Sequence, residues 1–464
     1  MTNEPVELTI IQTFEEGKDK QPLKKGFRPS FHALWHLKAL GVITDLATFV
    51  GAWDSIDPKP GTEVKIAVID TPVAYDHPNL RGSIDLALMR DFSVHDDGAF
   101  LVPTESGHIL TRRQELCNEL KAWGGTASAK KAITSETKGT DKRPPCAPRP
   151  NGAHGTAVAG LIGARPANVT LRKPSFRTNA NQDYDASIST DLAARDDTIP
   201  LPYVGINPFC RIIPISTTAS PDPGMVLAAL QYAMLIKPDI VVIAAAWEDQ
   251  RFRNGRWNAV NKAVLDLGKT AIVLCAAGNS GNTELAYPAC LSAAGGSVLA
   301  VTACDGKGKV LSYAPDPQDN DNVIRTLSSW TESYTTDGII IDPWKAIDPM
   351  VVQPSRDPVN KKGVANIPAV SLITLDVPGP YGYNPSPYRY RPPVDGPHFD
   401  IGSLYCHFSG TSAATAVAAG LISLAIQEYW QKFGIPTKQP KPLKPGKDLF
   451  DYPVAWNLVS LSRE

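Results

Sequence analysis

Three residues whose side chains could together perform nucleophilic chemistry each stand beside an apolar or small-residue segment. Ser412 opens the run 413–428, mostly Ala, Val, Leu and Ile, which predicts a buried helix. Asp70 ends the apolar run 64–69, which is typical of a buried parallel strand. His154 begins a small-residue segment that also predicts a helix. The head of a helix suits a reacting serine, because unpaired N–H groups and the positive dipole end favour developing negative charge.

A serine hydroxyl is a weak nucleophile at neutral pH, so it needs a base within hydrogen-bond reach and a group that orients the base. Ser412, His154 and Asp70 have the side chains for these three roles. Each also has a plain structural interpretation: Ser412 as the N-cap of a core helix, His154 as a capping or core histidine, and Asp70 as a helix cap. The sequence therefore predicts a catalytic site only if the elements that carry these residues converge.

In the order Asp, His, Ser, these segments resemble the subtilisin-like serine peptidases. Besides Asp70 after its apolar strand, the matching motifs are His154-Gly155-Thr156 with 158–160, Ala276-Ala277-Gly278-Asn279, and Gly410-Thr411-Ser412 with Ala414 and Gly420. His77 lies in a loop that resembles the family's His-Pro-x-Leu, so we expect it to pack or hydrogen-bond rather than act as the base.

The resemblance implies a role for each catalytic residue. Ser412 would attack the peptide carbonyl, His154 would take its proton, and Asp70 would fix the histidine tautomer. Asn279 would stabilise the oxyanion together with the N–H group of Ser412, although it could also be a simple turn residue. The implied function is a serine endopeptidase that works through an acyl-enzyme on Ser412. The alternative is a catalytically silent module of the same fold that binds peptides.

The resemblance also implies a set of substrate-binding residues. They are the strand edge Ala246, Trp247 and Glu248, the turn residues Ala277 and Gly278, and Ala286 as a small, uncharged pocket floor. The chain departs from the family here, since Ala246-Trp247-Glu248 replaces the usual Ser-Leu-Gly. It departs again beside the aspartate, where Thr71-Pro72 replaces a Ser or Thr followed by Gly. Pro72 lacks a backbone donor, so we expect a differently shaped turn.

Strands and helices alternate along the chain, which predicts an α/β fold with three layers, a mostly parallel central sheet and long loop insertions. We expect an N-terminal extension over residues 1–60 and a catalytic domain over 61–430. Insertions are expected at about 94–150, 165–200 and 313–368. The Lys- and Pro-rich residues 431–464 are expected to form a solvated C-terminal tail.

Composition narrows the location and the partners. The formal net charge of −1 favours neither nucleic acid nor acidic membrane as a partner. The N-terminal residues carry no secretory signal pattern, and no apolar run is long enough to span a membrane. The 7 cysteines are scattered without a C-x-x-C pair, which favours free thiols in a reducing compartment. We therefore expect a cytoplasmic protein.

The sequence predicts no metal site and no required cofactor. Relatives often bind calcium, but the only candidate loop is the weak stretch 316–321. The expected partner is a protein or peptide substrate. A free protease endangers a cell, so we also expect restricted specificity or a regulatory protein partner, with the insertions gating the cleft.

Overall fold

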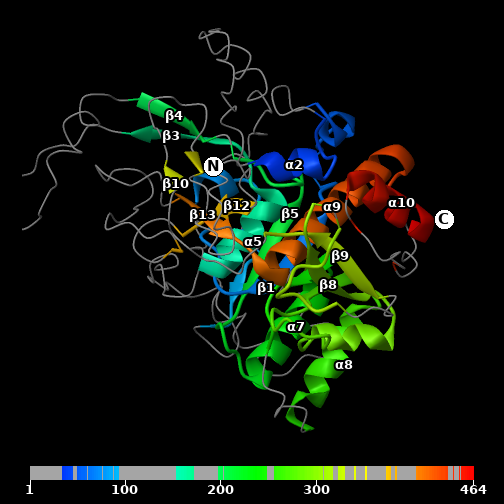
Figure 1. Cartoon of the computed structure of the whole chain (residues 1–464). Helices are drawn as coiled ribbons and strands as arrows, with labels where there is room; N and C mark the ends of the chain where they lie inside the picture. The colour runs from blue at the N-terminus through cyan, green and yellow to red at the C-terminus, as the bar shows by residue number, and fades with distance from the viewer. Residues whose placement is uncertain are drawn as a thin grey trace, which may run out of the picture.

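Seven parallel strands form the central sheet of the computed structural model, in the order β2-β5-β1-β6-β7-β8-β9 (Figure 1). Their bounds are β1 Lys65–Asp70, β2 Arg90–Asp91, β5 Arg211–Ser216, β6 Ile240–Ile243, β7 Ile272–Ala276, β8 Val298–Cys304 and β9 Val323–Leu327. The structure describes residues 34–44, 50–93 except 60, 76 and 87, 153–171, 197–316 except 202, 248–254 and 307, 322–329, 339–340, 351–352, 372–377, 382–383, 404–436, 443, 449 and 451–463.

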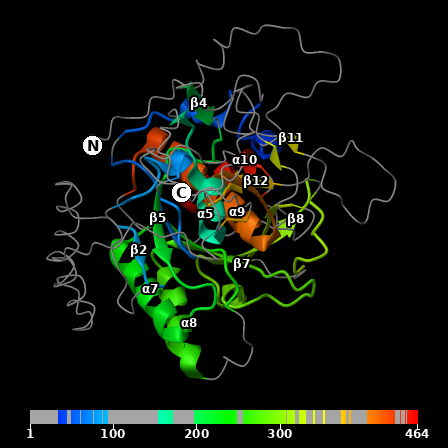
Figure 2. The ribbon, with the colours of Figure 1, turned by 90° about the vertical axis from the view of Figure 1, so that its left-hand side faces the viewer.

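Helices cover both faces of the sheet, as the alternating sequence pattern predicts. On one face lie α5 (Ala153–Gly163) and α9 (Gly410–Phe433), which pack side by side (Figure 2). On the other lie α7 (Pro223–Ile236) and α8 (Asn258–Leu267). Successive strand residues point to opposite faces, so Ile66 packs toward α5 and α9 while Ala67 packs toward α7 and α8. The α/β fold with a parallel central sheet is confirmed.

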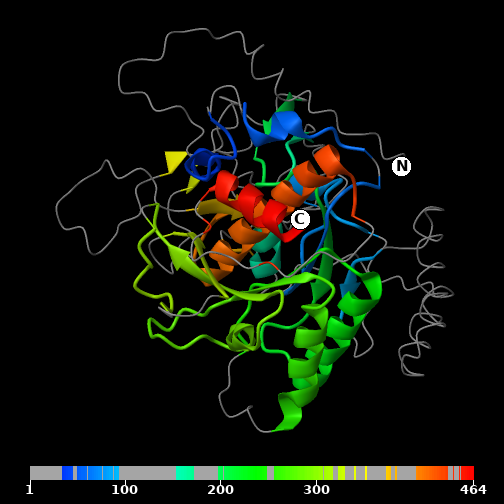
Figure 3. The ribbon, with the colours of Figure 1, turned by 90° about the vertical axis from the view of Figure 1, so that its right-hand side faces the viewer.

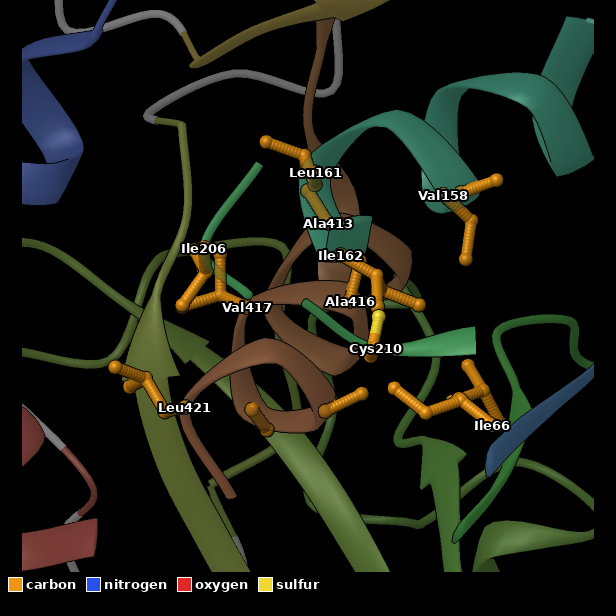
Figure 4. Close-up of a cluster of buried hydrophobic side chains, with 14 of the residues drawn as sticks. Ile66, Val158, Leu161, Ile162, Ile206, Cys210, Ala413, Ala416, Val417 and Leu421 are labelled. Atoms are coloured by element: carbon orange, nitrogen blue, oxygen red, sulfur yellow. The ribbon is translucent and has the colours of Figure 1, made fainter. Parts of the chain in front are cut away.

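The core between α9, α5 and the sheet is built from small and branched residues (Figure 4). All residues of α9 from Gly410 to Glu428 are buried. Gly420 lets α9 approach the chain closely, because a Cβ there would lie 2.6 Å from Cβ of Ile206. By length and composition α9 is the one helix in the described part of the chain that could cross a membrane, but its apolar stretch is entirely buried inside the protein. It is therefore a core helix.

Short strands form three further two-stranded antiparallel sheets. They are β3 (Ala167–Leu171) with β4 (Asp197–Leu201), β10 (Ile339–Ile340) with β11 (Val351–Val352), and β12 (Leu372–Leu375) with β13 (Tyr405–Phe408). The last pair matters for the site, since β13 leads directly into α9. Thr374 on β12 also donates a 2.7 Å hydrogen bond to the Ala157 carbonyl of α5.

The two ends of the described chain pack against the same core. Helix α2 (Trp35–Ala39) and the 3₁₀ turn η2 (Ala52–Ser55) belong to the N-terminal segment, where the Trp53 indole donates to the Ile206 carbonyl at 2.9 Å. Helix α10 (Tyr452–Arg463) lies along α9 (Figure 3). The remaining 3₁₀ turns are η3 Pro78–Leu80, η5 Gly255–Trp257 and η6 Ala289–Ala294.

The prediction of a solvated tail over residues 431–464 is wrong for Leu449 and for α10. Leu449, Ala455 and Val459 are buried in the core. The N–H group of Tyr452 donates to the Leu40 carbonyl at 2.7 Å, which ties α10 to the N-terminal segment. The Lys- and Pro-rich composition did not predict α10, because the apolar side of this helix is buried by segments that are distant in sequence.

Candidate active site

The structure brings Asp70 and His154 together at the carboxyl end of β1. The Nδ1 atom of His154 lies 2.8 Å from Oδ1 and 2.9 Å from Oδ2 of Asp70. The aspartate side chain is 1% exposed and the histidine side chain 17% exposed. The ring of His154 also meets Phe408 edge-on, with centroids 5.3 Å apart. The carboxylate therefore fixes the ring and holds the proton on Nδ1.

Two opposing effects set the proton affinity of His154. Burial lowers the pKa of His154, whereas the charge of Asp70 and its hydrogen bond raise it, and the net effect is a pKa above 6.5. The imidazolium is thus stabilised by a neighbouring carboxylate. Such an environment suits a base that must hold a proton during a reaction.

Ser412 lies in the first turn of α9, close to the helix that carries His154. It does not cap the helix, because the N-cap residue is Ser409. Its hydroxyl donates a 2.6 Å hydrogen bond to the carbonyl oxygen of Ala244, at the end of β6. Within the described residues, the hydrogen bonds of Ser412 do not include one to His154. A catalytic hydrogen bond is often formed only in the substrate complex, so this rotamer is compatible with a resting nucleophile.

Thr411 holds Asn279 in the turn after β7. The side-chain oxygen Oδ1 of Asn279 accepts hydrogen bonds from the N–H (2.9 Å) and the hydroxyl (3.1 Å) of Thr411. Because the oxygen faces Thr411, the amide nitrogen faces Gly410, where a Cβ would lie only 2.9 Å from Nδ2. Gly410 has a φ of 78°, which also favours glycine. The amide nitrogen of Asn279 therefore lies against Gly410, at the start of the helix that carries Ser412.

A hydrogen-bonded floor closes the space between the ends of β6 and β7. Ala286 donates its N–H to the Ala277 carbonyl, and Trp247 donates its N–H to the Tyr287 carbonyl, both at 2.8 Å. The Ala286 methyl group faces Gly278, where a Cβ would lie 2.8 Å from it. Ala277, Gly278 and Ala286 are thus in direct contact, as a small, uncharged pocket floor requires.

The expected substrate edge needs a correction at Trp247. Its N–H group is already bonded to Tyr287, and its side chain is 5% exposed. The indole stacks on Trp257 with centroids 6.3 Å apart and lies 6.2 Å from the ring of Tyr287. The Trp247 indole is therefore packed against Trp257 and Tyr287 and is not exposed at an edge. Glu248, the third residue of that edge, lies outside the described residues.

His77 is not placed to act as the base. Its Nε2 donates to the Leu404 carbonyl at 3.0 Å, and its Nδ1 accepts from the N–H of Asn79 at 3.1 Å. The ring is completely buried, which lowers the pKa of His77 to about 3. This neutral, fully bonded histidine packs and hydrogen-bonds as the sequence predicted.

Metal binding has little support in the described part of the chain. No group of three or more His, Cys, Asp or Glu side chains in those residues could hold a metal ion. Asp316, the first residue of the weak calcium candidate, is paired with Arg325 at 3.0 Å. Most of that stretch lies outside the described residues, so neither the prediction of no metal site nor the weak calcium candidate is tested.

Sequence reasoning missed several residues that position the site. They are Thr71, whose N–H and hydroxyl bond to Asp70, Ala244, which accepts from Ser412, and Thr411 and Tyr287 in the turns described above. Pro72 does not disturb the aspartate, because the donor is the N–H group of Thr71, at 2.6 Å from Oδ1. Thr71 and Thr411 are adjacent to motif residues, which was the only signal in the sequence.

Comparison with solved structures finds similarity to several proteases. A lanthipeptide protease has 15% sequence identity and a TM-score of 0.50, with 94% of this chain and 96% of that chain covered. The nisin leader peptidase NisP from Lactococcus lactis has 14% identity and a TM-score of 0.46, with 91% and 93% covered. The epidermin leader peptide processing serine protease EpiP from Staphylococcus aureus has 16% identity and a TM-score of 0.45, with 94% and 82% covered.

A comparison of the sequence with curated proteins gives no significant match. The sequence pattern of the subtilase family, in contrast, matches residues 61–439, which is most of the chain. That span contains β1, α5, β7 and the start of α9, the elements that carry the candidate residues. The chain therefore belongs to the subtilase family and is a serine-type endopeptidase.

Proposed function

We propose that the protein hydrolyses peptide bonds through an acyl-enzyme on Ser412, with His154 as the base, Asp70 as its orienting partner and Asn279 as an oxyanion donor. The hydrogen-bonded pair of Asp70 and His154, beside the helix that carries Ser412 in its first turn, is the observation that supports these roles. A serine, an imidazole and a buried carboxylate in this arrangement suit acyl transfer.

The reaction follows from the geometry. Ser412 turns from the Ala244 carbonyl to Nε2 of His154, gives up its proton and attacks the substrate carbonyl carbon. The carbonyl oxygen becomes negative and accepts hydrogen bonds from the Asn279 amide and the Ser412 N–H group. His154 then delivers the proton to the leaving amine as the C–N bond breaks. Water then attacks the acyl carbon through its oxygen and gives a proton to His154. His154 returns that proton to the Ser412 oxygen as the bond between this oxygen and the acyl carbon breaks.

We also propose a specificity for small, uncharged side chains at the residue whose carbonyl is attacked. The Ala286 methyl group fills part of the space over Gly278, and Trp247 and Tyr287 close the floor behind it. A long side chain would clash there, and a charged one would lose its hydration without a partner. Restricted cleavage also agrees with the hazard of a free protease in a cell. Rapid, indiscriminate digestion of casein by the isolated chain would contradict this specificity.

We infer a reducing, cytoplasmic compartment from the cysteines. The five described ones, Cys210, Cys275, Cys290, Cys304 and Cys406, are free thiols, and all but Cys290 are buried. Structural disulfides are rare in such compartments. Fractionation of the native cells, with free-thiol titration of the denatured protein, tests this: disulfides or an extracellular fraction would contradict it.

Labelling with a fluorophosphonate tests the catalytic proposal. The folded wild-type protein should be labelled, and Ser412→Ala should not. Ser423→Ala is the matched control, because Ser423 is a second buried serine of α9 whose hydroxyl donates to the Gly420 carbonyl and accepts from Nδ2 of Asn207. It should still be labelled. An unlabelled but folded wild type would contradict the proposal and favour a silent peptide-binding module. Cleavage of a peptide library by the unlabelled wild-type protein would then test the preference for small, uncharged residues.

A further inference from the structure

Thr71 contacts the aspartate and the histidine-bearing helix at the same time. Its N–H group and its hydroxyl lie 2.6 Å and 3.2 Å from Oδ1 of Asp70. The same hydroxyl oxygen accepts a 2.9 Å hydrogen bond from the N–H of Gly155, the residue after His154. Thr71 is buried, so water does not compete for these contacts.

The partners fix the direction of each hydrogen bond. Gly155 can only donate through its N–H, and that group is one of the first-turn donors of α5 that lack a partner within the helix. The carboxylate of Asp70 can only accept. The hydroxyl proton of Thr71 must therefore point to Asp70, and its lone pair to Gly155. The result is a directed chain of donors from the start of α5 to the carboxylate.

Close backbone contact reinforces this chain. A Cβ on Gly155 would lie 2.1 Å from the carbonyl oxygen of Thr71, so the first turn of α5 rests directly on the backbone after β1. A second link runs from the N–H of Ala74 to the hydroxyl of Thr156, at 2.9 Å. The position of His154 relative to Asp70 is thus set by contacts that centre on Thr71.

We propose that Thr71 is a positioning residue whose hydroxyl holds the Asp70 carboxylate and the first turn of α5 in one hydrogen-bonded frame. The inference rests on the proposed catalytic roles of Asp70 and His154. It goes beyond them because it assigns the geometry of that pair to a side chain that touches neither the substrate nor the reacting atoms.

Loss of the hydroxyl should have two separable effects. The first turn of α5 would lose a fixed partner, so proton transfer through His154 would be less well aligned and kcat would fall. The carboxylate would also lose one donor and present more charge to the imidazolium. Asp70 is the charged group that acts on the pKa of His154 in the described residues, so that pKa would rise further.

The test is Thr71→Val, which removes the hydroxyl and keeps the branched shape. We expect kcat per titrated active site to fall by about 10- to 100-fold, KM to change by less than about twofold, and the acidic limb of the kcat/KM profile to move to higher pH. Thr71→Ser should restore the wild-type limb. Should valine prevent folding, Thr71→Ala compared with Thr71→Ser gives the same contrast.

Thr217→Val is the matched control. Thr217 is also buried beside Asp70, but its hydroxyl lies 3.5 Å from the backbone carbonyl of Asp70 and not against the carboxylate. The acidic limb of the kcat/KM profile of Thr217→Val should lie at the same pH as in the wild type. An unchanged kcat and limb in Thr71→Val, or equal losses in Thr71→Ala and Thr71→Ser, would overturn the inference. Failure of the wild type to react with a fluorophosphonate would instead overturn the proposed function.

Discussion

At the scale of single residues, the charge of Asp70 has the largest expected effect on activity. Asp70→Asn keeps the size of the side chain but removes the charge that raises the pKa of His154 against the effect of burial. It also allows the wrong tautomer of the imidazole. We expect kcat to fall by about 10⁴-fold, as is usual when such a carboxylate becomes an amide.

The charge of Asp70 also determines the pH at which activity is lost on the acidic side. In the wild type the pKa of His154 lies above 6.5, so activity should be lost on the acidic side as the imidazole becomes protonated. In Asp70→Asn only burial remains to shift this pKa, so the residual activity should persist to lower pH. Kinetics of the wild type and of Asp70→Asn between about pH 5 and 9 measure the acidic limb of each protein. An acidic limb at the same pH in both would contradict the pairing of charge and proton affinity.

Asn279 is expected to act only once negative charge develops on the substrate. Its amide nitrogen is oriented because Thr411 occupies the oxygen. Asn279→Ala should therefore lower kcat by about 10²–10³-fold and leave KM nearly unchanged. Asn282→Ala is the control, because Asn282 lies exposed near the same turn and bonds only to the N–H of Glu284 at 3.1 Å. A large rise in KM for Asn279→Ala would indicate a role in ground-state binding instead.

At the scale of elements, α10 is expected to contribute to stability as a core helix. Val459 is 1% exposed and Val454 is 38% exposed on the same helix. Val459→Ala should lower the free energy of unfolding by about 2 kcal/mol, because it removes buried methyl groups. Val454→Ala should change it by less than about 0.5 kcal/mol. Urea unfolding of both variants in a Ser412→Ala background avoids self-digestion, and equal effects would contradict the packing of α10 on α9.

Most of the elements could be predicted because their signals are local. The apolar run 64–69 and the small-residue run 413–428 correspond to β1 and to the interior of α9, since buried strands and helices of a parallel sheet need apolar residues throughout. Segment 452–463 has no such continuous run. Its buried side is covered by α9 and by the N-terminal segment, which are far away in sequence.

The site was predictable to the same degree, for the same reason. Motifs identify Asp70, His154, Asn279 and Ser412 because each chemical role requires one residue type. The supporting contacts depend on distances between segments: the hydroxyl of Thr71 meets Gly155, and the indole of Trp247 stacks on Trp257. No local pattern encodes them, and so Trp247 was expected on an open edge although it lies in the core.

At the scale of the whole molecule, a buried polar junction joins segments that bring the site together. Asn79 donates from Nδ2 to the carbonyls of Arg165 and Leu201, both at 2.9 Å, and accepts from the hydroxyl of Tyr405 at 3.0 Å. His77 bonds to Leu404 at the start of the segment that leads into α9. The loop after β1, the end of the α5 segment, β4 and β13 therefore meet at these two residues.

This junction makes the stability of the protein depend on pH through His77. Burial lowers the pKa of His77 to about 3 in the folded protein, despite the hydrogen bond to Leu404. In the unfolded chain the pKa is about 6.5. Between these two values the unfolded chain binds a proton that the folded protein excludes, so the free energy of unfolding falls as the pH drops. The full difference is of the order of 5 kcal/mol and is complete only below about pH 3.

Urea unfolding of Ser412→Ala and of Ser412→Ala with His77→Gln, at pH 7 and at steps down to about pH 4, measures this contribution. Gln can still donate to the Leu404 carbonyl but does not titrate, so the variant should lose less stability over this range than its parent. His154 provides a contrast of opposite sign. Its raised pKa stabilises the folded protein below pH 6.5, and that contribution is lost as the pH rises through the folded pKa. His154→Gln should therefore flatten the alkaline side of the curve, and parallel acid curves with and without His77 would contradict a neutral histidine at the junction.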